Sequence, residues 1–179
     1  ECRRVIADML KQFMCIFIKE PTLGGGAGIL RVARTTPAEE INRFLHAYAT
    51  GGCRLIVDEG IEGVDISVQW FIHPDGRVER RFITRQYIVG GSLHIGNGIE
   101  SSLCSHRVLP EDWQEKTKEL AHTHAWQNTD PLVMWARKHG YVGSIGFDLR
   151  ADKKGMTYIL ECNGRFTAAG YPASVQEQL

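Results

Sequence analysis

Apolar residues in the first third of the chain follow spacings that alternate between helix and strand. Residues 13–18 form a continuous apolar run of strand length, which ends at Lys19. Thr36 and Pro37 are residue types that favour a helix N-terminus, and the helix that they start is expected to end at Gly51. The predicted elements are, in order, a helix at 2–12, strands at 13–18 and 29–32, a helix at 36–51 and a strand at 54–57.

The rest of the chain changes period several times. Apolar and polar residues alternate along 65–72, and after a turn at 73–76 the chain returns as a strand, which predicts a half-exposed antiparallel hairpin. The segment 89–98 is rich in glycine, and we expect it to be irregular. The further predicted elements are two helices, at 110–126 and 130–140, and two short strands, at 146–150 and 158–165.

The last two strands are separated by a charged turn with a glycine, which predicts a β-hairpin. If two residues form the tip, Asp148 lies opposite Glu161 on one face of the pair, with Cβ atoms about 5 Å apart. A three-residue loop would shift the pairing by one residue, and a second irregularity would be needed to restore it.

Three polar residues occupy alternate positions at the end of the final strand: Glu161, Asn163 and Arg165. Alternate side chains share a face, so they are expected to lie beside Asp148. Two carboxylates about 5 Å apart repel by about 3 kcal/mol at an effective dielectric constant near 20, and a divalent cation would remove this repulsion. Oxygen ligands suit Mg²⁺. The alternative is a strand whose polar residues only face water.

Four glycines follow the first strand and Lys19: Gly24, Gly25, Gly26 and Gly28. Their exposed N–H groups could close over phosphates. The loop is not a Walker loop, because the lysine precedes the glycines, and Arg31 breaks the G-x-G-x-x-G pattern. The alternative is a flexible hairpin that binds no ligand.

Four acids fall within residues 58–65, which also contain two glycines. Such a segment is usually a solvated loop. The alternative is that it lines a nucleotide base and its ribose.

Composition narrows the class of protein. The chain has 179 residues, 43% of them hydrophobic, and a formal net charge of zero. This balance predicts a folded protein and gives no basic surface for nucleic acid. No apolar run reaches the ~20 residues of a membrane span, so we expect a cytoplasmic protein. Five cysteines without a C-x-x-C pattern favour reduced thiols. Cys162 and Leu160 alternate with the polar positions and are predicted to point into packing.

Four motifs stand in order along the chain: I-K-E-P-x-x-G-G-G-A-G-I, L-I-V-D-E-G-I-E-G-V-D-I-S-V, G-x-x-G-S-I-G-F-D-L and Y-I-L-E-C-N-G-R-F. Together they resemble the ATP-grasp superfamily of the carboxylate–amine ligase type, from Phe13 onward. The resemblance implies an α+β ATP-grasp fold, in which two lobes with antiparallel sheets clasp a nucleotide. We expect these lobes at residues 1–59 and 60–179.

The resemblance also implies roles for individual residues. For the nucleotide, Lys19 contacts the phosphates, Gly24, Gly25, Gly26 and Gly28 form a mobile lid, Asp58 lies at the adenine hinge, Glu59 and Ile61 read adenine through the backbone, and Asp65 takes the ribose. For the reaction, Asp148, Glu161 and Asn163 hold Mg²⁺, with Mn²⁺ as the alternative ion, and Arg165 faces the reacting carboxylate as the catalytic residue.

Members of this kind join a carboxylate, such as an amino acid or peptide, to an amine through an acylphosphate, with ATP and Mg²⁺ as cofactors. The alternatives are a nucleotide-binding module without turnover, or another ATP-grasp chemistry such as thioester formation or phosphoryl transfer. The family usually has a domain before the grasp and continues after the position of Arg165, so we expect a fragment or part of a longer polypeptide. Small-molecule carboxylate and amine partners are expected, and a homo-oligomer is compatible with the sequence. The segment 89–105, which should meet the acceptor, gives no readable pattern.

Overall fold

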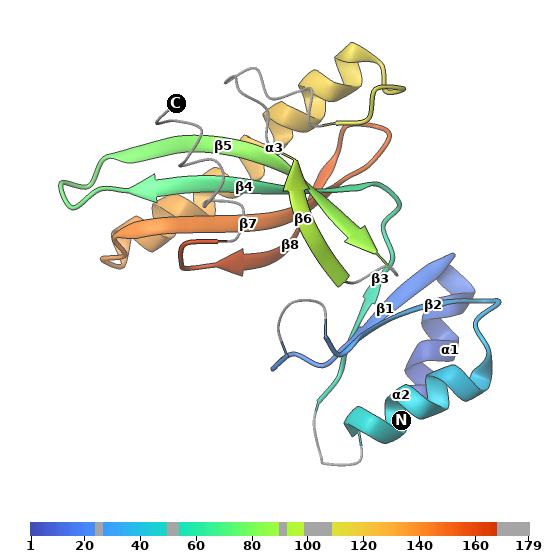
Figure 1. Ribbon diagram of the computed structural model, residues 1–179. Helices are drawn as coiled ribbons and strands as arrows, with labels where there is room; N and C mark the ends of the chain where they lie inside the picture. Colours follow the sequence, from blue (N-terminus) through green and yellow to red (C-terminus); the bar gives the residue numbers. More distant parts are fainter. Residues whose placement is uncertain (24–26, 50–53, 90–92, 99–108, 168–179) are drawn as a thin grey trace. The chain divides into compact units, whose positions relative to one another are not determined.

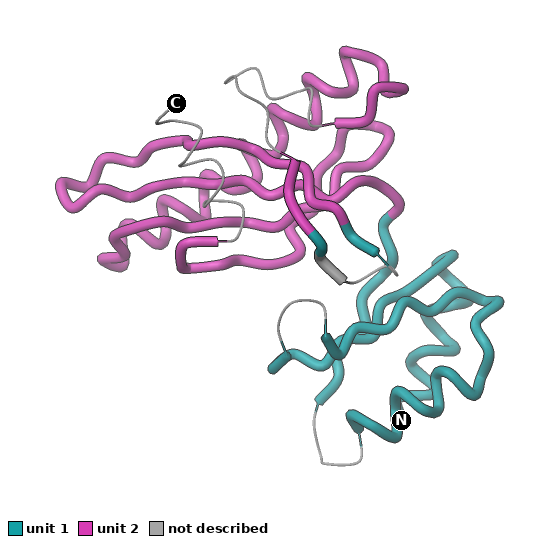
Figure 2. The backbone as a smooth tube through the Cα atoms, in the orientation of Figure 1, with its two compact units in different colours: residues 1–61, 88–95 teal, residues 62–87, 96–179 magenta. Residues whose placement is uncertain are grey.

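The computed structural model describes residues 1–23, 27–49, 54–89, 93–98 and 109–167 (Figure 1). The chain divides into two compact units, one of residues 1–61 and 88–95 and the other of residues 62–87 and 96–179 (Figure 2). The first boundary falls two residues after the one expected from the sequence, and residues 88–95, which were expected in the second lobe, group with unit 1.

Unit 1 is a three-stranded sheet with two helices. Its elements are α1 (Cys2–Gln12), β1 (Cys15–Lys19), β2 (Ile29–Ala33), α2 (Ala38–Ala49) and β3 (Ile56–Glu59). The strand order is β2-β1-β3, and both pairings are antiparallel. Ile16 and Ile18 of the central strand are fully buried, and they form a core with Ile6 of α1 and Leu45 of α2. The predicted helices and strands of this part of the chain are confirmed, with bounds that differ by up to two residues. The expected helix end at Gly51 lies outside the described residues.

Unit 2 is a five-stranded sheet covered on one face by a long helix. Its elements are β4 (Val64–Ile72), β5 (Val78–Val89), β6 (Leu93–Gly98), α3 (Glu115–Lys138), β7 (Gly143–Ala151) and β8 (Thr157–Asn163). The last two residues of β5 and the first three of β6 group with unit 1. The strand order is β6-β5-β4-β7-β8, and β4 pairs antiparallel with both β5 and β7. Figure 1 shows α3 behind the sheet. The α+β class expected from the sequence is confirmed.

The two faces of this sheet differ in chemistry because side chains alternate along each strand. Val68 on β4 and Phe147 on β7 are opposed, completely buried, and packed with Trp126 and Val133 of α3. The other face, which we call the polar face, presents the side chains of Ser67, Gln69, Asp148, Glu161 and Asn163. The apolar face therefore packs against α3, and the polar face gathers side chains that can hydrogen-bond or bind ligands.

The two helices predicted at 110–126 and 130–140 are one continuous helix, so this expectation was wrong. Pro131 lies inside α3. Its missing N–H costs one helical hydrogen bond, but Trp126 and Val133, on either side of it, are buried in the same core. The hydroxyl of Thr129 also accepts a hydrogen bond from Trp70 Nε1 at 3.0 Å. Packing against the sheet therefore outweighs the proline. None of the helices in the described part of the chain is long and apolar enough to cross a membrane.

The glycine-rich segment 89–98 was also predicted wrongly, because part of it forms strand β6. The strand lies at the edge of the sheet beside β5. A neighbouring strand supplies hydrogen bonds that do not depend on side chains, and glycine is tolerated at such an edge.

Gly63→Ala is expected to destabilise unit 2. A Cβ atom at Gly63 would lie 2.0 Å from the carbonyl oxygen of Ala151, where β4 begins to pair with β7. The backbones would have to separate, at a cost of about 1–3 kcal/mol in the free energy of unfolding. Urea unfolding measures this. Gly96→Ala is the matched control, since a Cβ there meets nothing within 4 Å, and equal midpoints for the two variants would contradict the prediction.

Candidate functional site

The hairpin of β7 and β8 brings Asp148 opposite Glu161. Of the two loops that the sequence allows, the hairpin has the three-residue loop, with a second irregularity that restores the pairing. Ala151 pairs with Thr157, and the N–H of Asp152 donates to the carbonyl of Met156 at 2.9 Å. The tip therefore has three residues, 153–155, and Gly155 has φ +80° within it. A register shift between Asp148 and Leu149 leaves Leu160 as an extra residue in β8. This bulge restores the opposition that the loop alone would have removed.

Helix α3 holds the tip of this hairpin. His124 Nδ1 donates to the carbonyl oxygen of Gly155 at 2.7 Å, and Asn128 Nδ2 donates to the carbonyl and hydroxyl oxygens of Thr157 at 2.9 Å each. A Cβ at Gly155 would lie 2.8 Å from Leu120 Cβ. The loop is therefore packed too closely against the helix for a side chain at this position, and its contacts support the register of the two strands.

Asp148 is the most extensively hydrogen-bonded of the predicted metal ligands. Its Oδ1 accepts from Ser67 Oγ at 2.7 Å and from Gln86 Nε2 at 2.9 Å, and its Oδ2 accepts from Asn163 Nδ2 at 3.3 Å. Asn163 is buried, whereas Glu161 is exposed. Asp148 and Asn163 are thus in contact, and Glu161 lies across the strand pair from Asp148.

The donor set fits a hard cation. Two carboxylates and one amide supply only oxygen atoms, which Mg²⁺ prefers. Within the described ranges, no group of three or more His, Cys, Asp and Glu side chains could hold a metal ion. The set of Asp148, Glu161 and Asn163 contains two residues of these types and one amide. Its ability to hold a cation therefore depends on the amide oxygen of Asn163.

Cys162 and Leu160 do not point into packing, so this expectation was wrong. Both are exposed, because β8 is the edge strand of the sheet. Cys162 is opposite Phe147 and so lies on the other side of β8 from Glu161. Partial burial, and then the nearby Glu161 carboxylate, raise the pKa of the Cys162 thiol above its ordinary value. A thiol that stays protonated is a poor nucleophile, which agrees with a non-catalytic role.

β8 ends at Asn163, so the expectation that Arg165 lies on the strand was wrong. Arg165 follows in a short segment that is hydrogen-bonded to the sheet at both ends. Its backbone N–H donates to the carbonyl of Asn163 at 2.9 Å, and its side chain is exposed. Two residues further on, Thr167 is buried and its hydroxyl donates to Gln69 Oε1 at 2.9 Å. The guanidinium therefore extends from an anchored backbone.

In unit 1, the residues predicted to bind nucleotide lie along β1 and β3. Lys19 Nζ and Asp58 Oδ2 form an ion pair at 2.6 Å, with both side chains partly exposed. Glu59 is exposed at the end of β3, and Ile61 is partly buried just after it. Between them, the N–H of Gly60 donates to the carbonyl of Cys15 at 2.8 Å.

The predicted phosphate lid is described only in part. Gly28 has φ +70°, and its carbonyl accepts from the N–H of Glu20 at 2.8 Å, which closes the β1–β2 hairpin. Gly24, Gly25 and Gly26 lie outside the described residues.

Asp65, the predicted ribose ligand, is engaged elsewhere in unit 2. It is opposite Arg150 on β7, and the guanidinium donates to both carboxylate oxygens, at 2.6 and 2.7 Å from Nη2 and 2.9 Å from Nε. The side chains are 13% and 16% exposed. The sequence did not single out Arg150, because the pairing of β4 with β7 joins segments more than eighty residues apart in the chain.

The sequence left unassigned two residues that hydrogen-bond to Asp148, Ser67 and Gln86, and two that follow behind Ser67, Gln69 and Thr167. The alternation of β4 had placed Ser67 and Gln69 on the polar side of a hairpin. Their burial depends on neighbouring elements, so the pattern could indicate only the face.

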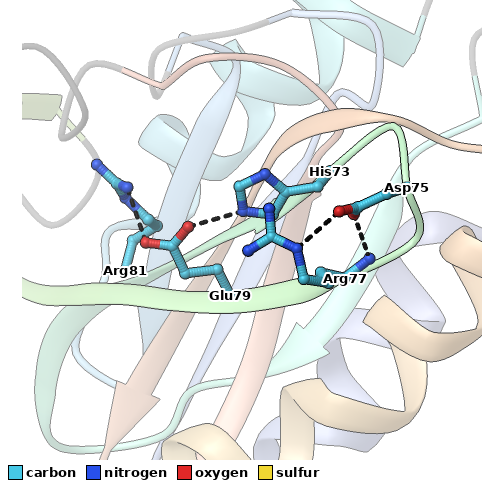
Figure 3. A network of polar contacts seen from close by, with 5 residues as sticks. All are labelled: His73, Asp75, Arg77, Glu79 and Arg81. Atoms are coloured by element: carbon cyan, nitrogen blue, oxygen red, sulfur yellow. Dashed lines mark hydrogen bonds and ion pairs between the residues drawn. The ribbon is translucent and has the colours of Figure 1, made fainter.

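A second polar cluster occupies the turn between β4 and β5. Figure 3 shows the Glu79 carboxylate between His73 and Arg81, at 2.9 and 2.8 Å, with Asp75 beside Arg77. These side chains come from one turn and the start of one strand, where Glu79 joins His73 to Arg81 and Asp75 pairs with Arg77. The cluster therefore stabilises the turn and is not the candidate site.

This cluster predicts a contribution to acid sensitivity. The hydrogen bond from His73, and then that from Arg81, hold the pKa of Glu79 below its ordinary value of 4.5. A depressed folded-state pKa gives stability that is present above 4.5 and is lost as the pH falls below it. Glu79→Gln should therefore flatten the decline of the unfolding free energy between about pH 5 and 3. Urea titrations across this range measure it, and parallel profiles would contradict the prediction.

Comparisons with known proteins give structural relatives only. No family model matches the sequence, and no curated protein matches it. A biotin carboxylase from Campylobacter jejuni, solved with βγ-ATP, is similar with a TM-score of 0.63 and 17% identity over 92% of this chain and 34% of that one. The biotin carboxylase domain of 2-oxoglutarate carboxylase from Hydrogenobacter thermophilus, solved with MgADP, ADP and bicarbonate, has a TM-score of 0.61 and 17% identity over 100% of this chain and 40% of that one.

A D-alanyl-alanine synthetase A from Vibrio cholerae has a TM-score of 0.58 and 17% identity over 89% of this chain and 44% of that one. The chain thus spans less than half the length of each of these three relatives. At such identities the likeness shows the fold.

Proposed function

The chain has the ATP-grasp fold, and on this premise we propose that the protein to which it belongs is an ATP- and Mg²⁺-dependent ligase. It would join a carboxylate to an amine through an acylphosphate and release ADP. The observation that supports this most directly is the opposition of Asp148 and Glu161, with Asn163 in contact with Asp148, on the polar face of one sheet.

Asp148, Glu161 and Asn163 are the residues that would hold Mg²⁺. When bound there, the ion would offset the negative charge of phosphate oxygens. Ser67 and Gln86 already orient Asp148 through Oδ1. The amide of Asn163, which now donates to Asp148, would have to turn over to present its oxygen to a cation.

Unit 1 would supply further nucleotide contacts. Lys19 is held by Asp58 at the end of β1, and phosphate oxygens would compete with this carboxylate for the ammonium group. The lid glycines would add backbone N–H groups, and Glu59 and Ile61 would present backbone groups to adenine. Asp65 could take a ribose only by exchanging hydrogen bonds with Arg150.

Arg165 would act on the reacting carboxylate. A guanidinium near the developing charge stabilises the transition state without a side-chain nucleophile. Catalysis of this kind depends on positioning, so an anchored segment is the appropriate support for Arg165.

The structural relatives support the class of the first substrate. One was solved with bicarbonate and another is named as a D-alanyl-alanine synthetase. Bicarbonate and an amino acid both offer a carboxylate-type oxygen that can accept a phosphoryl group. We therefore propose a small carboxylate as the group activated and a small amine as the acceptor.

We expect the complete protein to bind MgADP and to release ADP from ATP only when a carboxylate and an amine are both supplied. This chain by itself is expected to bind nucleotide weakly. It spans less than half the length of each relative, so we do not expect it to position both substrates. Little or no ligation should result, because misplacement of the reacting groups by ~1 Å can cost ~100-fold in rate. Calorimetry with ADP and Mg²⁺, beside a coupled ADP-release assay, tests both polypeptides.

Absence of nucleotide binding by both would overturn the proposal. Binding without turnover by the complete protein, across broad panels of carboxylates and amines, would favour a nucleotide-binding module instead.

A further inference from the structure

Three side chains on unit 2 form a continuous chain of hydrogen bonds that ends on Asp148. Thr167 Oγ1 donates to Gln69 Oε1 at 2.9 Å, Gln69 Nε2 donates to Ser67 Oγ at 2.8 Å, and Ser67 Oγ donates to Asp148 Oδ1 at 2.7 Å. Every donor points the same way along the chain, towards the carboxylate. Hydrogen bonds with one direction polarise and strengthen one another.

These links are shielded from solvent. Ser67 is 1% exposed, Gln69 is 4% exposed and Thr167 is 7% exposed. Bulk water therefore cannot readily replace a lost partner, and a buried polar group without a partner is unfavourable. Loss of one of these hydrogen bonds is therefore expected to be more unfavourable than loss of a hydrogen bond at the surface.

Gly146 makes room for the middle of the chain. It is opposite Gln69 on β4, and a Cβ atom there would lie 2.7 Å from Gln69 Nε2 and 2.6 Å from Thr167 Cγ2. Any larger residue would force Gln69 and Thr167 to move. Position 146, the glycine of the G-F-D motif, therefore has no room for a side chain.

The two ends of the chain are the groups to which the proposed function assigns chemistry. One end is the carboxylate of Asp148. The other is the segment after β8 that contains Arg165 and ends in the anchored Thr167. Asn163 closes the loop, because its side chain donates to Asp148 and its carbonyl accepts from the N–H of Arg165.

We propose that Gln69 is a positioning residue that sets the Asp148 carboxylate and the Arg165 segment in one geometry. The inference rests on the proposed function for the roles of these two groups. A primary amide is suited to this position because it accepts from Thr167 and donates to Ser67 at once. Neither a carboxylate nor an apolar side chain can do both.

The test uses the complete protein and compares matched variants. Thr167→Val removes the hydroxyl and keeps the shape, Thr167→Ser keeps the hydroxyl, and Gln69→Met removes both hydrogen bonds with a similar volume. Mn²⁺ in the presence of ADP is the probe, with free and bound ion separated by electron paramagnetic resonance. The melting temperature without metal is measured in parallel.

We expect Gln69→Met and Thr167→Val to weaken Mn²⁺ affinity by ~10-fold or more, as loss of a partner behind a metal ligand typically does. Thr167→Ser should retain the affinity. The double variant, Gln69→Met with Thr167→Val, should bind Mn²⁺ no more weakly than Gln69→Met alone, because both substitutions break the same series of hydrogen bonds.

Three outcomes would overturn the inference. The first is a lower melting temperature with unchanged Mn²⁺ affinity in the valine and methionine variants, which would indicate a purely structural role. The second is additive losses in the double variant. The third is absence of Mn²⁺–ADP binding by the unsubstituted protein, which would overturn the proposed function as well, whereas the first two leave that function standing.

Discussion

Glu161→Gln is expected to reduce ATP-dependent turnover by at least the ~10–100-fold that loss of a partner behind a metal ligand costs. The substitution keeps the shape of the side chain and removes its charge. Glu161 lies opposite Asp148, and its side chain makes no hydrogen bond or ion pair with another described residue, so the loss cannot be attributed to a broken side-chain contact within the described fold. The ADP-release assay, run across Mg²⁺ concentrations, measures it.

Cys162→Ala is the matched control for this prediction. Cys162 is the next residue of the same strand, is also exposed, and lies on the other side of β8. We expect its substitution to leave turnover nearly unchanged. Equal losses in the two variants would indicate that β8 is merely sensitive to substitution, and full activity of Glu161→Gln would remove Glu161 from the metal site.

Asp65→Ala should destabilise unit 2 by about 3–5 kcal/mol, which is the usual cost of removing one partner of a buried ion pair. Asp65 and Arg150 are 13% and 16% exposed and joined through both carboxylate oxygens. The pair is thus largely desolvated, and the weak effects typical of surface pairs do not apply. The free energy of unfolding in urea measures the loss.

The same residue decides between a structural and a nucleotide-binding role. Asp65→Asn keeps the shape and an acceptor oxygen, so more of the protein should stay folded for binding studies. If Asp65 serves the ion pair alone, the folded variant should bind ADP with unchanged affinity. A loss of ADP affinity without a loss of stability would instead support the ribose role. The double variant Asp65→Ala with Arg150→Met should recover part of the stability, because the guanidinium that has lost the Asp65 carboxylate is removed as well.

Local pattern was sufficient for most elements of the fold. The strand at β1 and the hairpin of β4 and β5 were predictable because their periodicity and turn residues are written in adjacent positions. Asp148 and Glu161 were expected to be opposed because a hairpin couples register to loop length. The structure confirms that expectation, but through a bulge at Leu160 that no local sequence pattern predicted.

Errors arose where long-range packing overrode a local signal. Pro131 predicted a break, yet the burial of Trp126 and Val133 against one sheet keeps α3 continuous. Glycines predicted an irregular segment where β6 forms beside β5. In each case the contribution of tertiary contacts exceeds the propensity of one or two residues.

The residue types and their order determined most of the helices and strands and the polar end of β8. Only the tertiary structure decided which groups from segments distant in the chain meet. The pairing of β4 with β7 joins Asp65 to Arg150 and Ser67 to Asp148. The segment after β8 brings Thr167 to Gln69. The reason is physical: alternation along a strand specifies the face on which a side chain lies, whereas its partner depends on the register between strands distant in the chain, which the packing of the whole unit selects.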